Sequence, residues 1–442
     1  MQWWVRAAWA LTLPGARLRR FGFVTTNSIT QTFSRRVIEA RLAGTPPIAL
    51  VMAIADHPWT KATRDSAAVR IAMTVADAGS DDGQLIEVLQ EAALDTDAPE
   101  LLTATAKGRI NADLTVGADV TSARPLRANT VMASPGVKLH GAGFIVTPAD
   151  AVTLGLGSRP GLDQHIRSYR NGRDLMGNGR GAMVIDLFGL AEAEVRQRFP
   201  EVWQHLHATV KPERDANRRA TYRDNWWIFG EPRRDLRPAL SGLERYIVTV
   251  ETAKHRVFQF LDASILPDNM LIAIASDDAF HVGVLSSHIH IRWSNGMGGT
   301  LEDRPRYTKS QIFDPFPFPN PTPDQRAAIA DLAEELDATR KIVQAEHPDI
   351  TLTGLYNLVE KLRAGAVLIA AEADTARRAR ASIILELHRR IDAAVAAAYG
   401  WPADLAAADI VARLVALNAA RAAEEAAGTI RWLRPDYQAG RA

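Results

Sequence analysis

The sequence predicts a mixed architecture in which an α/β segment over residues 1–125 is followed by an α+β region over residues 126–320 and an all-α bundle over residues 321–442. Strand-like and helix-like patterns alternate in the first part, as in an α/β sheet. The second part has short strand candidates among glycines and charged residues. Beyond Pro323 the composition shifts to Ala, Leu, Glu and Arg at helical spacing. A length of 442 residues, at roughly 150 residues per domain, agrees with three parts.

The composition excludes several classes of protein. With 47% hydrophobic and 23% charged residues, the chain has the balance of a folded globular protein. The apolar opening from Trp3 to Leu13 contains Arg6, and no run reaches the roughly 18 apolar residues of a membrane helix. Basic residues follow that opening instead of preceding it, which argues against a signal peptide. The chain has no cysteine, so it cannot form a disulfide, a thiolate zinc site or a thiol nucleophile, which fits a reducing compartment. Together with the lack of a predicted membrane helix or signal peptide, this leads us to expect a cytoplasmic protein with no membrane partner.

The first part is expected to be the end of a parallel sheet. Ser28 is a candidate N-cap for the second of its two helices. The expected helices are Trp3–Leu18 and a stretch from Ser28 to Leu42, and the expected strands are Phe21–Thr26, Ile48–Ile54, Ala67–Val75 and Gln84–Leu89. Parallel sheets are normally covered on both faces, and two helices cannot cover both. We therefore expect a sheet that begins in mid-fold, with residue 1 lying where a missing half would attach.

The second and third parts are predicted from their patterns in the same way. The expected elements of the second part are a strand and helix start at Gly141–Pro148, a strand at Ala182–Phe188, a helix at Ala191–His207, and strands at Tyr246–Val250 and Val257–Leu261. In the third part, Ile384, Leu387, Ile391 and Val395 recur at helical spacing, which predicts a helical bundle.

Basic residues gather in three clusters of the middle region. Between Lys211 and Arg256 there are eleven Lys or Arg against seven Asp or Glu, with tyrosine and tryptophan among them. The other two clusters comprise Arg167, Arg170, Asn171 and Arg173, and Arg292, Arg304, Arg306 and Lys309. Arginine mixed with aromatic and amide side chains suits phosphate positioning and base readout. A solvated surface with cation–π packing is the alternative, but three clusters in one region favour a polyanion.

No catalytic, cofactor or metal site is predicted in this chain. His205 with His207, and His288 with His290, are two residues apart, a spacing that points helical side chains in different directions. The glycines between Gly155 and Gly161 resemble a phosphate loop, but Pro160 removes an amide donor there.

Several motifs resemble one family, the large class I S-adenosylmethionine-dependent DNA adenine methyltransferases of the MmeI-like group and the related DISARM-type defence methyltransferases. The segments that carry the resemblance are Phe23–Gln31 (FVTTNSITQ), Tyr169–Leu175 (YRNGRDL), Val184–Leu190 (VIDLFGL), Lys254–Phe258 (KHRVF), Leu285–His288 (LSSH), Pro305–Lys309 (PRYTK), Phe313–Pro319 (FDPFPFP) and Ala397–Pro402 (AAYGWP). They span nearly the whole chain. The resemblance implies a remnant of the methyltransferase sheet, then a target recognition domain, then a helical domain.

Two motifs of that family are missing from the sequence. The family binds its cofactor with a glycine-rich turn and holds the flipped adenine with an Asn/Asp-Pro-Pro-Tyr/Phe motif. Thr45-Pro46-Pro47-Ile48 lacks both the amide and the aromatic ring of that motif. The resemblance therefore implies late strands of the catalytic sheet only, with S-adenosylmethionine bound when a separately encoded N-terminal half completes the enzyme.

The leading hypothesis is the DNA target-recognition portion of a site-specific DNA (adenine-N6) methyltransferase of restriction-modification or phage-defence type, inactive alone. The predicted contacts with double-stranded DNA are Arg304, Arg306, Lys309, Arg170, Asn171 and Arg173, and Asn27 and Ser28 are predicted to lie near the catalytic face. Each has a structural alternative, because Asn27 can cap a helix and the arginines can be rim charges. The competing hypothesis is a protein-interaction or stand-alone DNA-binding fragment with no methyltransferase role.

Overall fold

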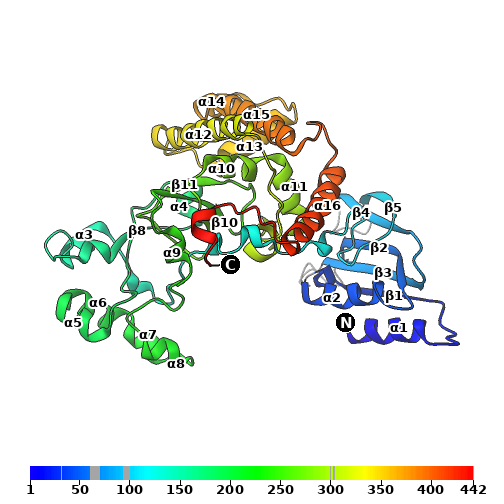
Figure 1. Cartoon of the computed structure of the whole chain (residues 1–442), viewed down its shortest axis with the longest axis horizontal. Coiled ribbons are helices and arrows are strands. Elements are labelled where there is room, and N and C mark those ends of the chain that lie inside the picture. The colour runs from blue at the N-terminus through cyan, green and yellow to red at the C-terminus, as the bar shows by residue number, and fades with distance from the viewer. Residues whose placement is uncertain (31, 60–69, 93–99, 299, 302–303, 442) are drawn as a thin grey trace. The chain divides into compact units, whose positions relative to one another are not determined.

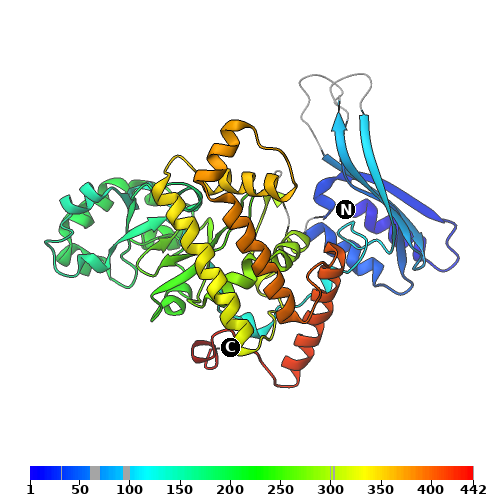
Figure 2. The ribbon, with the colours of Figure 1, turned by 90° about the horizontal axis from the view of Figure 1, so that it is seen from above.

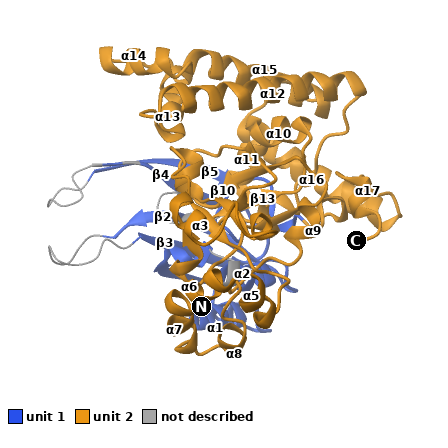
Figure 3. Ribbon diagram, turned by 90° about the vertical axis from the view of Figure 1, so that its left-hand side faces the viewer, with its two compact units in different colours: residues 1–123 blue, residues 124–442 orange. Residues whose placement is uncertain are grey.

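The computed structural model describes residues 1–30, 32–59, 70–92, 100–298, 300–301 and 304–441. The chain divides into two compact units, unit 1 over residues 1–123 and unit 2 over residues 124–442 (Figures 1 and 3). Mixed α/β sheets are followed by a helical C-terminal region. Within the described part of the chain, no helix combines the length and the apolar character that crossing a membrane requires.

Unit 1 is a five-stranded sheet with two helices. The helices are α1 (Gln2–Thr12) and α2 (Thr32–Leu42), and the strands are β1 (Arg20–Thr26), β2 (Ile48–Pro58), β3 (Arg70–Ala78), β4 (Gly83–Ala92) and β5 (Glu100–Gly108). The strand order in the sheet is β1-β3-β2-β4-β5. The four predicted strands are present, although residues 67–69 of the third lie outside the described residues. The first helix is shorter than predicted because Leu13 precedes Pro14 and is extended.

The prediction of a parallel sheet is wrong. Only β2 and β4 run parallel, whereas β1 with β3, β2 with β3 and β4 with β5 are all antiparallel. The reason lies in the connections: parallel neighbours need a crossover of about a dozen residues or more, usually a helix, and α2 is the only described helix between two strands of this unit. The strand β5 escaped prediction because its side chains are mostly exposed and lack an apolar alternation.

The core of unit 1 lies on one face of its sheet. Phe21 and Leu50 both stand in register with Ala76, and all three are buried with Trp4 of α1 and Ile38 of α2. Both helices therefore cover this face, and Figure 1 shows them on the same side of the strands.

The opposite face of the sheet carries apolar side chains that are not fully buried. Val24 and Ile54 are both in register with Met73, and Ile54 is also in register with Ile86. Val24 is 54% exposed, and the other three side chains are half-buried. Within unit 1, no described helix packs on this row.

Unit 2 contains two four-stranded sheets, in the orders β11-β10-β13-β6 and β12-β8-β9-β7, and the two-stranded sheet β14-β15. The strands are β6 (Ala133–Pro135), β7 (Ile145–Val146), β8 (Ile166–Arg170), β9 (Met183–Ile185), β10 (Arg245–Val250), β11 (Gln259–Asp262), β12 (Leu266–Pro267), β13 (Leu271–Ile274), β14 (Thr300–Leu301) and β15 (Arg304–Pro305). The expected strands near residues 183, 246 and 259 are thus present within a few residues of their predicted bounds.

Nine helices of the described chain precede the C-terminal helical region in unit 2. They are α3 (Pro148–Thr153), α4 (Gly172–Met176), α5 (Glu192–Arg198), α6 (Pro200–Thr209), α7 (Lys211–Asp215), α8 (Ala220–Asp224), α9 (Leu236–Leu240), α10 (Ala279–Ser286) and α11 (His288–Met297). The single helix predicted from Ala191 to His207 is two helices, because Pro200 cannot donate a hydrogen bond inside a helix and instead starts α6. The start of α3 is as predicted, with Thr147 as N-cap.

The C-terminal residues form the predicted helices and pack on the rest of unit 2. They are α12 (Pro323–Glu346), α13 (Leu352–Arg363), α14 (Ala370–Arg378), α15 (Ala381–Tyr399), α16 (Ala407–Ala426) and α17 (Pro435–Gln438). Figures 1 and 2 both show α12 beside α15. Gly283 of α10 allows a close approach to α12, since a Cβ there would lie 2.5 Å from Ile329. Asp337 of α12 also accepts a hydrogen bond from the backbone of Phe260.

Candidate nucleic-acid interface

The segment that follows β10 lies between two of the basic clusters. On one side, Thr252 forms an antiparallel bridge with Arg306, and Tyr307 donates its backbone N–H to Glu251 over 2.6 Å. On the other side, Gly172 lies against Val250, because a Cβ at Gly172 would be 3.0 Å from that side chain. The fold thus brings together the clusters around residues 170 and 306, which are far apart in the sequence.

A cavity of about 920 Å³, called the recognition groove from here on, opens at this junction. Its lining residues are Asn171, Gly172, Arg173, Met176, Val250, Thr252, Ala253, Lys254, Asp268, Met270 and Thr353. Arg173 and Lys254 give it two cations against the one carboxylate of Asp268. Arg173 is exposed and has no side-chain hydrogen bond or ion pair with any residue that the structure describes.

The other two predicted residues of that cluster have local roles. Asn171 is the N-cap of α4: its side chain accepts a hydrogen bond from the backbone of Asp174, and Asp174 in turn accepts one from the backbone of Asn171. Its amide nitrogen remains without a partner among the described residues. Arg170 is half-buried and its guanidinium lies over Gly179, where a Cβ would collide with it. Of the three, Arg173 is the most available to a ligand.

The predicted DNA contacts near the end of the middle region, Arg304, Arg306 and Lys309, also differ in how available they are to a ligand. Arg306 is exposed and forms an ion pair of 2.6 Å with Glu251. Lys309 lies 3.3 Å from Asp314, a carboxylate whose pKa is raised by burial although Lys309 opposes that shift. The side chain of Arg304 lies outside the described part of the structure. Arg306 is thus held at the edge of the segment that borders the groove, while Lys309 has a structural partner.

In the large basic cluster between residues 211 and 256, several arginines form hydrogen bonds or ion pairs with other residues of unit 2. Arg214 is 1% exposed and donates to the carbonyl oxygens of Leu139 and Ile228, each over 2.9 Å. Arg237 forms two hydrogen bonds of 2.7 and 2.9 Å with Asp186, and Arg245 pairs with Glu334. These side chains stabilise unit 2 and do not support the interpretation that the whole cluster faces a polyanion.

Arg256 is a shielded cation without a counter-ion. It donates to the carbonyl oxygen of Pro305 over 2.9 Å, contacts the carbonyl of Val250, and lies over the ring of Tyr307. No carboxylate of the described residues lies within ion-pair distance of it. Burial lowers its pKa to about 10, so the guanidinium stays charged at neutral pH. Its Nε has no hydrogen-bond partner.

Sequence reasoning did not select Lys254, Arg256 and Arg292 as contacts, although all three belong to the basic clusters. They line a second cavity of about 350 Å³ that shares Ala253 and Lys254 with the recognition groove. Arg363, from helix α13, also lines this cavity. No sequence signal could have found Arg363, because the third part of the chain displayed only helical periodicity.

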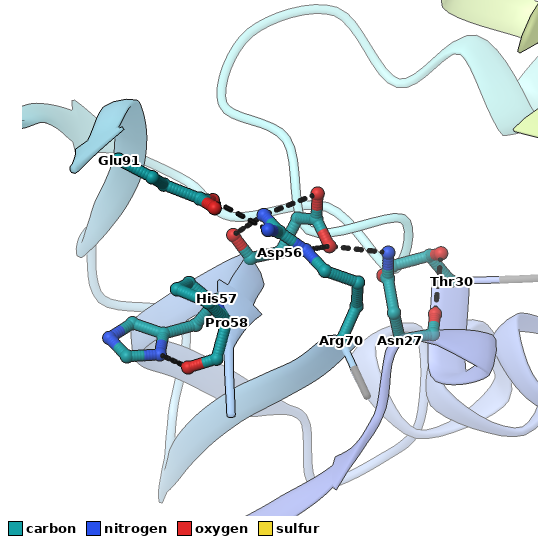
Figure 4. A network of polar contacts seen from close by, with 7 residues as sticks. All are labelled: Asn27, Thr30, Asp56, His57, Pro58, Arg70 and Glu91. Atoms are coloured by element: carbon teal, nitrogen blue, oxygen red, sulfur yellow. Dashed lines mark hydrogen bonds and ion pairs between the residues drawn. The ribbon is translucent and has the colours of Figure 1, made fainter. Parts of the chain in front are cut away.

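In unit 1, Asn27 belongs to an exposed polar network at the end of β1 (Figure 4). Its amide nitrogen donates to Asp56 over 2.9 Å, and Asp56 also accepts two hydrogen bonds of 2.9 Å from Arg70. Arg70 donates further to Glu91 over 2.5 Å. The hydrogen bond to Asp56 is the largest cause of the raised pKa of Arg70. The network joins β1, β2, β3 and β4 at one end of the sheet, and neighbouring Ser28 shares a hydrogen bond of 2.6 Å with Thr26.

The turn after β1 does not fit a cofactor-binding turn. It is a 3₁₀ turn, Asn27–Thr30, that contains no glycine. Glycine-rich turns in nucleotide-binding folds let the backbone approach the ligand closely, and this turn has a side chain at each position. No described residue therefore provides a cofactor site of that kind at the end of β1.

Comparison with known proteins places the middle of the chain in a family. Residues 122–320 match the family model described as "MmeI, target recognition domain". This segment contains the recognition groove, except for Thr353 in the helical region. No curated protein matches the chain.

Among solved structures, the chain is similar to that of the Type IIL restriction-modification enzyme MmeI in complex with DNA. The TM-score is 0.68 at 21% sequence identity, and the match covers 91% of this chain and 50% of MmeI. The type IIG restriction endonuclease BpuSI aligns with a TM-score of 0.27 at 11% identity, over 86% of this chain and 48% of BpuSI. The chain thus shares the fold of MmeI and spans about half of its length.

Proposed function

We propose that this chain is the DNA target-recognition portion of a site-specific DNA (adenine-N6) methyltransferase of restriction-modification or phage-defence type. One observation carries the proposal: Arg173, from a segment about 80 residues away, and Lys254, from the segment after β10, line one groove of about 920 Å³ within a target recognition domain. MmeI, whose fold the chain shares, was solved in complex with DNA.

Duplex recognition would divide between phosphate and base contacts. Exposed Arg173 and Lys254 can neutralise phosphates without sequence preference. Arg306 and Arg304 are the candidates for reading guanine in the major groove, and the unpartnered amide nitrogen of Asn171 is the candidate donor to a base edge. Arg170 and Lys309 are weaker candidates, because one is half-buried and the other pairs with Asp314.

Unit 1 would supply late strands of the catalytic sheet. In this proposal Asn27 and Ser28 lie near the catalytic face, and the chain is inactive alone because it lacks the glycine-rich turn and the Asn-Pro-Pro-aromatic motif. A separately encoded N-terminal half would bind S-adenosylmethionine and complete the enzyme.

The test is duplex binding by the full chain at several salt concentrations. A recognition domain that contacts phosphates loses affinity linearly on logarithmic axes as salt rises. Retention on duplex DNA that is equal at 50 and 200 mM salt would contradict the proposal. Equilibrium dialysis with labelled S-adenosylmethionine is the companion measurement: we expect no binding by this chain alone, and tight binding would identify an independently active enzyme.

The free edge of β1 supports a second candidate function, protein interaction. β1 pairs only with β3 among the described strands, and the run Phe21–Thr26 contains neither lysine nor proline to protect that edge. Exposed Val24 adds an apolar contact on the uncovered face. A strand of a partner α/β domain could extend the sheet here.

Coexpression tests this second function. A methyltransferase N-terminal half, expressed with this chain, should copurify with it and should be lost on Val24→Lys. The control is Thr105→Lys on the opposite edge strand β5, which should leave copurification unchanged. Equal recovery with wild type and Val24→Lys would argue against docking at β1.

A further inference from the structure

The cavity of about 350 Å³ next to the recognition groove, called the anchor cavity here, is lined by five parts of unit 2. The segment 253–256, the region where α10 meets α11, strand β15, helix α13 and helix α15 each contribute lining residues. Only Ala253 and Lys254 are shared with the recognition groove. The anchor cavity therefore adjoins the groove while drawing most of its wall from other elements.

The lining of the anchor cavity has an excess of positive charge. Arg363 pairs with Glu360 over 3.3 Å, and the ring of His288 lies 3.2 Å from the carboxylate of Asp392. The remaining cations, Lys254, Arg256 and Arg292, have no carboxylate partner among the described residues. Lys254 donates only to the neutral amide of Asn357, and Arg292 is exposed without a hydrogen bond or ion pair.

The polar groups of this wall are incompletely satisfied. Lys254 and Arg292 are exposed to water, whereas Arg256 is shielded and has no counter-ion among the described residues. Two shielded polar atoms in the same wall, Arg256 Nε and Ser286 Oγ, also have no hydrogen-bond partner. A positive cavity with low-dielectric walls concentrates anions, and guanidinium and ammonium groups are the usual partners of phosphate.

We propose that the anchor cavity binds one phosphate group, held at its mouth by Lys254 and Arg292 in the field of Arg256. The identification of that phosphate as part of a DNA backbone lying in the recognition groove rests on the proposed function. The contact carries no sequence information, because it involves only phosphate oxygens. It would fix the position of the duplex while residues along the groove read the bases.

Arg292→Ala tests the site, with Arg390→Ala as matched control. Both arginines are exposed, lie in helices and lack partners among the described residues, but Arg390 of α15 lines neither cavity. Losing one phosphate contact should lower the salt slope of duplex binding by about 0.9. The loss of affinity between 50 and 200 mM salt should then be about 3.5-fold smaller for Arg292→Ala than for wild type. Arg390→Ala should match wild type.

Sequence independence and charge provide two further readouts. Arg292→Ala should weaken binding equally for duplexes of unrelated sequence, and Arg292→Lys should restore the slope, because a phosphate contact requires charge and not a bidentate fork. A salt slope for Arg292→Ala equal to that of wild type overturns the proposal while leaving duplex recognition intact. So does a loss of affinity confined to one sequence.

Inorganic phosphate distinguishes the sources of the ligand. Phosphorus-31 line broadening on titration with the full chain should be reduced in Arg292→Ala and kept in Arg390→Ala. If wild type fails to bind duplex but shows this Arg292-dependent broadening, the proposed function fails and the anchor cavity stands as a site for free phosphate. Equal broadening by wild type and Arg292→Ala overturns the site itself.

Discussion

Replacing Arg237 tests whether the large basic cluster serves the fold or the ligand. Arg237 donates two hydrogen bonds, of 2.7 and 2.9 Å, to an Asp186 side chain that is only 3% exposed. Arg237→Ala leaves this carboxylate shielded and uncompensated. Removing one partner of a buried ion pair costs about 3–5 kcal/mol. Because the Arg237 side chain is 23% exposed, we expect the low end, about 3 kcal/mol.

The assay is thermal unfolding by circular dichroism, with Arg234→Ala as the control. Arg234 lies three residues away, is exposed and has no ion pair among the described residues. At roughly 2 °C per kcal/mol for a large unit, Arg237→Ala should lower the melting temperature by about 6 °C, and Arg234→Ala should leave it unchanged. Replacing the pair together, Asp186→Leu with Arg237→Met, should recover most of the loss, since an apolar pair removes the stranded charge.

The salt dependence of duplex binding by Arg237→Ala tests whether the role of Arg237 is structural. If Arg237 is structural, folded Arg237→Ala keeps the salt slope of the wild type. A variant with unchanged melting temperature but a slope lowered by about 0.9 would mean that Arg237 contacts phosphate. The structural interpretation of Arg214, Arg237 and Arg245 would then fail with it.

Three further predictions concern single residues. Arg173→Ala in the recognition groove should lower the salt slope of duplex binding by about 0.9 without changing the melting temperature, as filter binding and a thermal melt can check. Asn171→Ala should destabilise unit 2 by about 1 kcal/mol by removing the cap of α4, whereas Asn171→Ser should retain most of the stability in denaturant titration. Burial lowers the pKa of His281 to about 4 and that of His290 to about 3, so the unfolded chain binds protons that the folded chain does not as pH falls below about 6.5. Stability should therefore fall from pH 7 towards pH 4, by up to about 1.4 kcal/mol per pH unit for each histidine, and His281→Gln should reduce that slope in urea titrations at pH 7 and pH 5.

Local patterns predicted the elements of unit 1 better than their pairing. The apolar runs at Phe21–Thr26 and Ile48–Ile54 are strands because their residues suit a pleated, half-buried surface. Strand direction depends on the connections, and the pattern of alternating elements did not reveal that β2 and β3 are antiparallel neighbours. The strand β5 was missed for another reason. Hydrophobic periodicity detects buried strands, and most side chains of β5 are exposed.

The candidate site was only partly predictable for a related reason. Sequence motifs located the segments around Arg173 and Arg306, and both lie within residues 122–320, which match the target recognition domain. That both segments border the strand end at Val250 follows from pairings between residues 50 to 80 positions apart, which composition does not encode. The helical region supplies Arg363 and Thr353 to the two cavities, and its periodicity indicated packing alone.

Arginine has two roles in this chain, and the structure separates them by partner. Arg214 is held by backbone carbonyls and Arg237 by Asp186, so moving either into contact with DNA would break bonds that unit 2 needs. Arg173 and Arg292 have no such bonds to lose, and binding a phosphate would cost them only side-chain freedom and part of their hydration. Arg173 lines the recognition groove and Arg292 lines the anchor cavity. For that reason we expect the duplex to bind at these two surfaces and not at the densest basic stretch of the sequence.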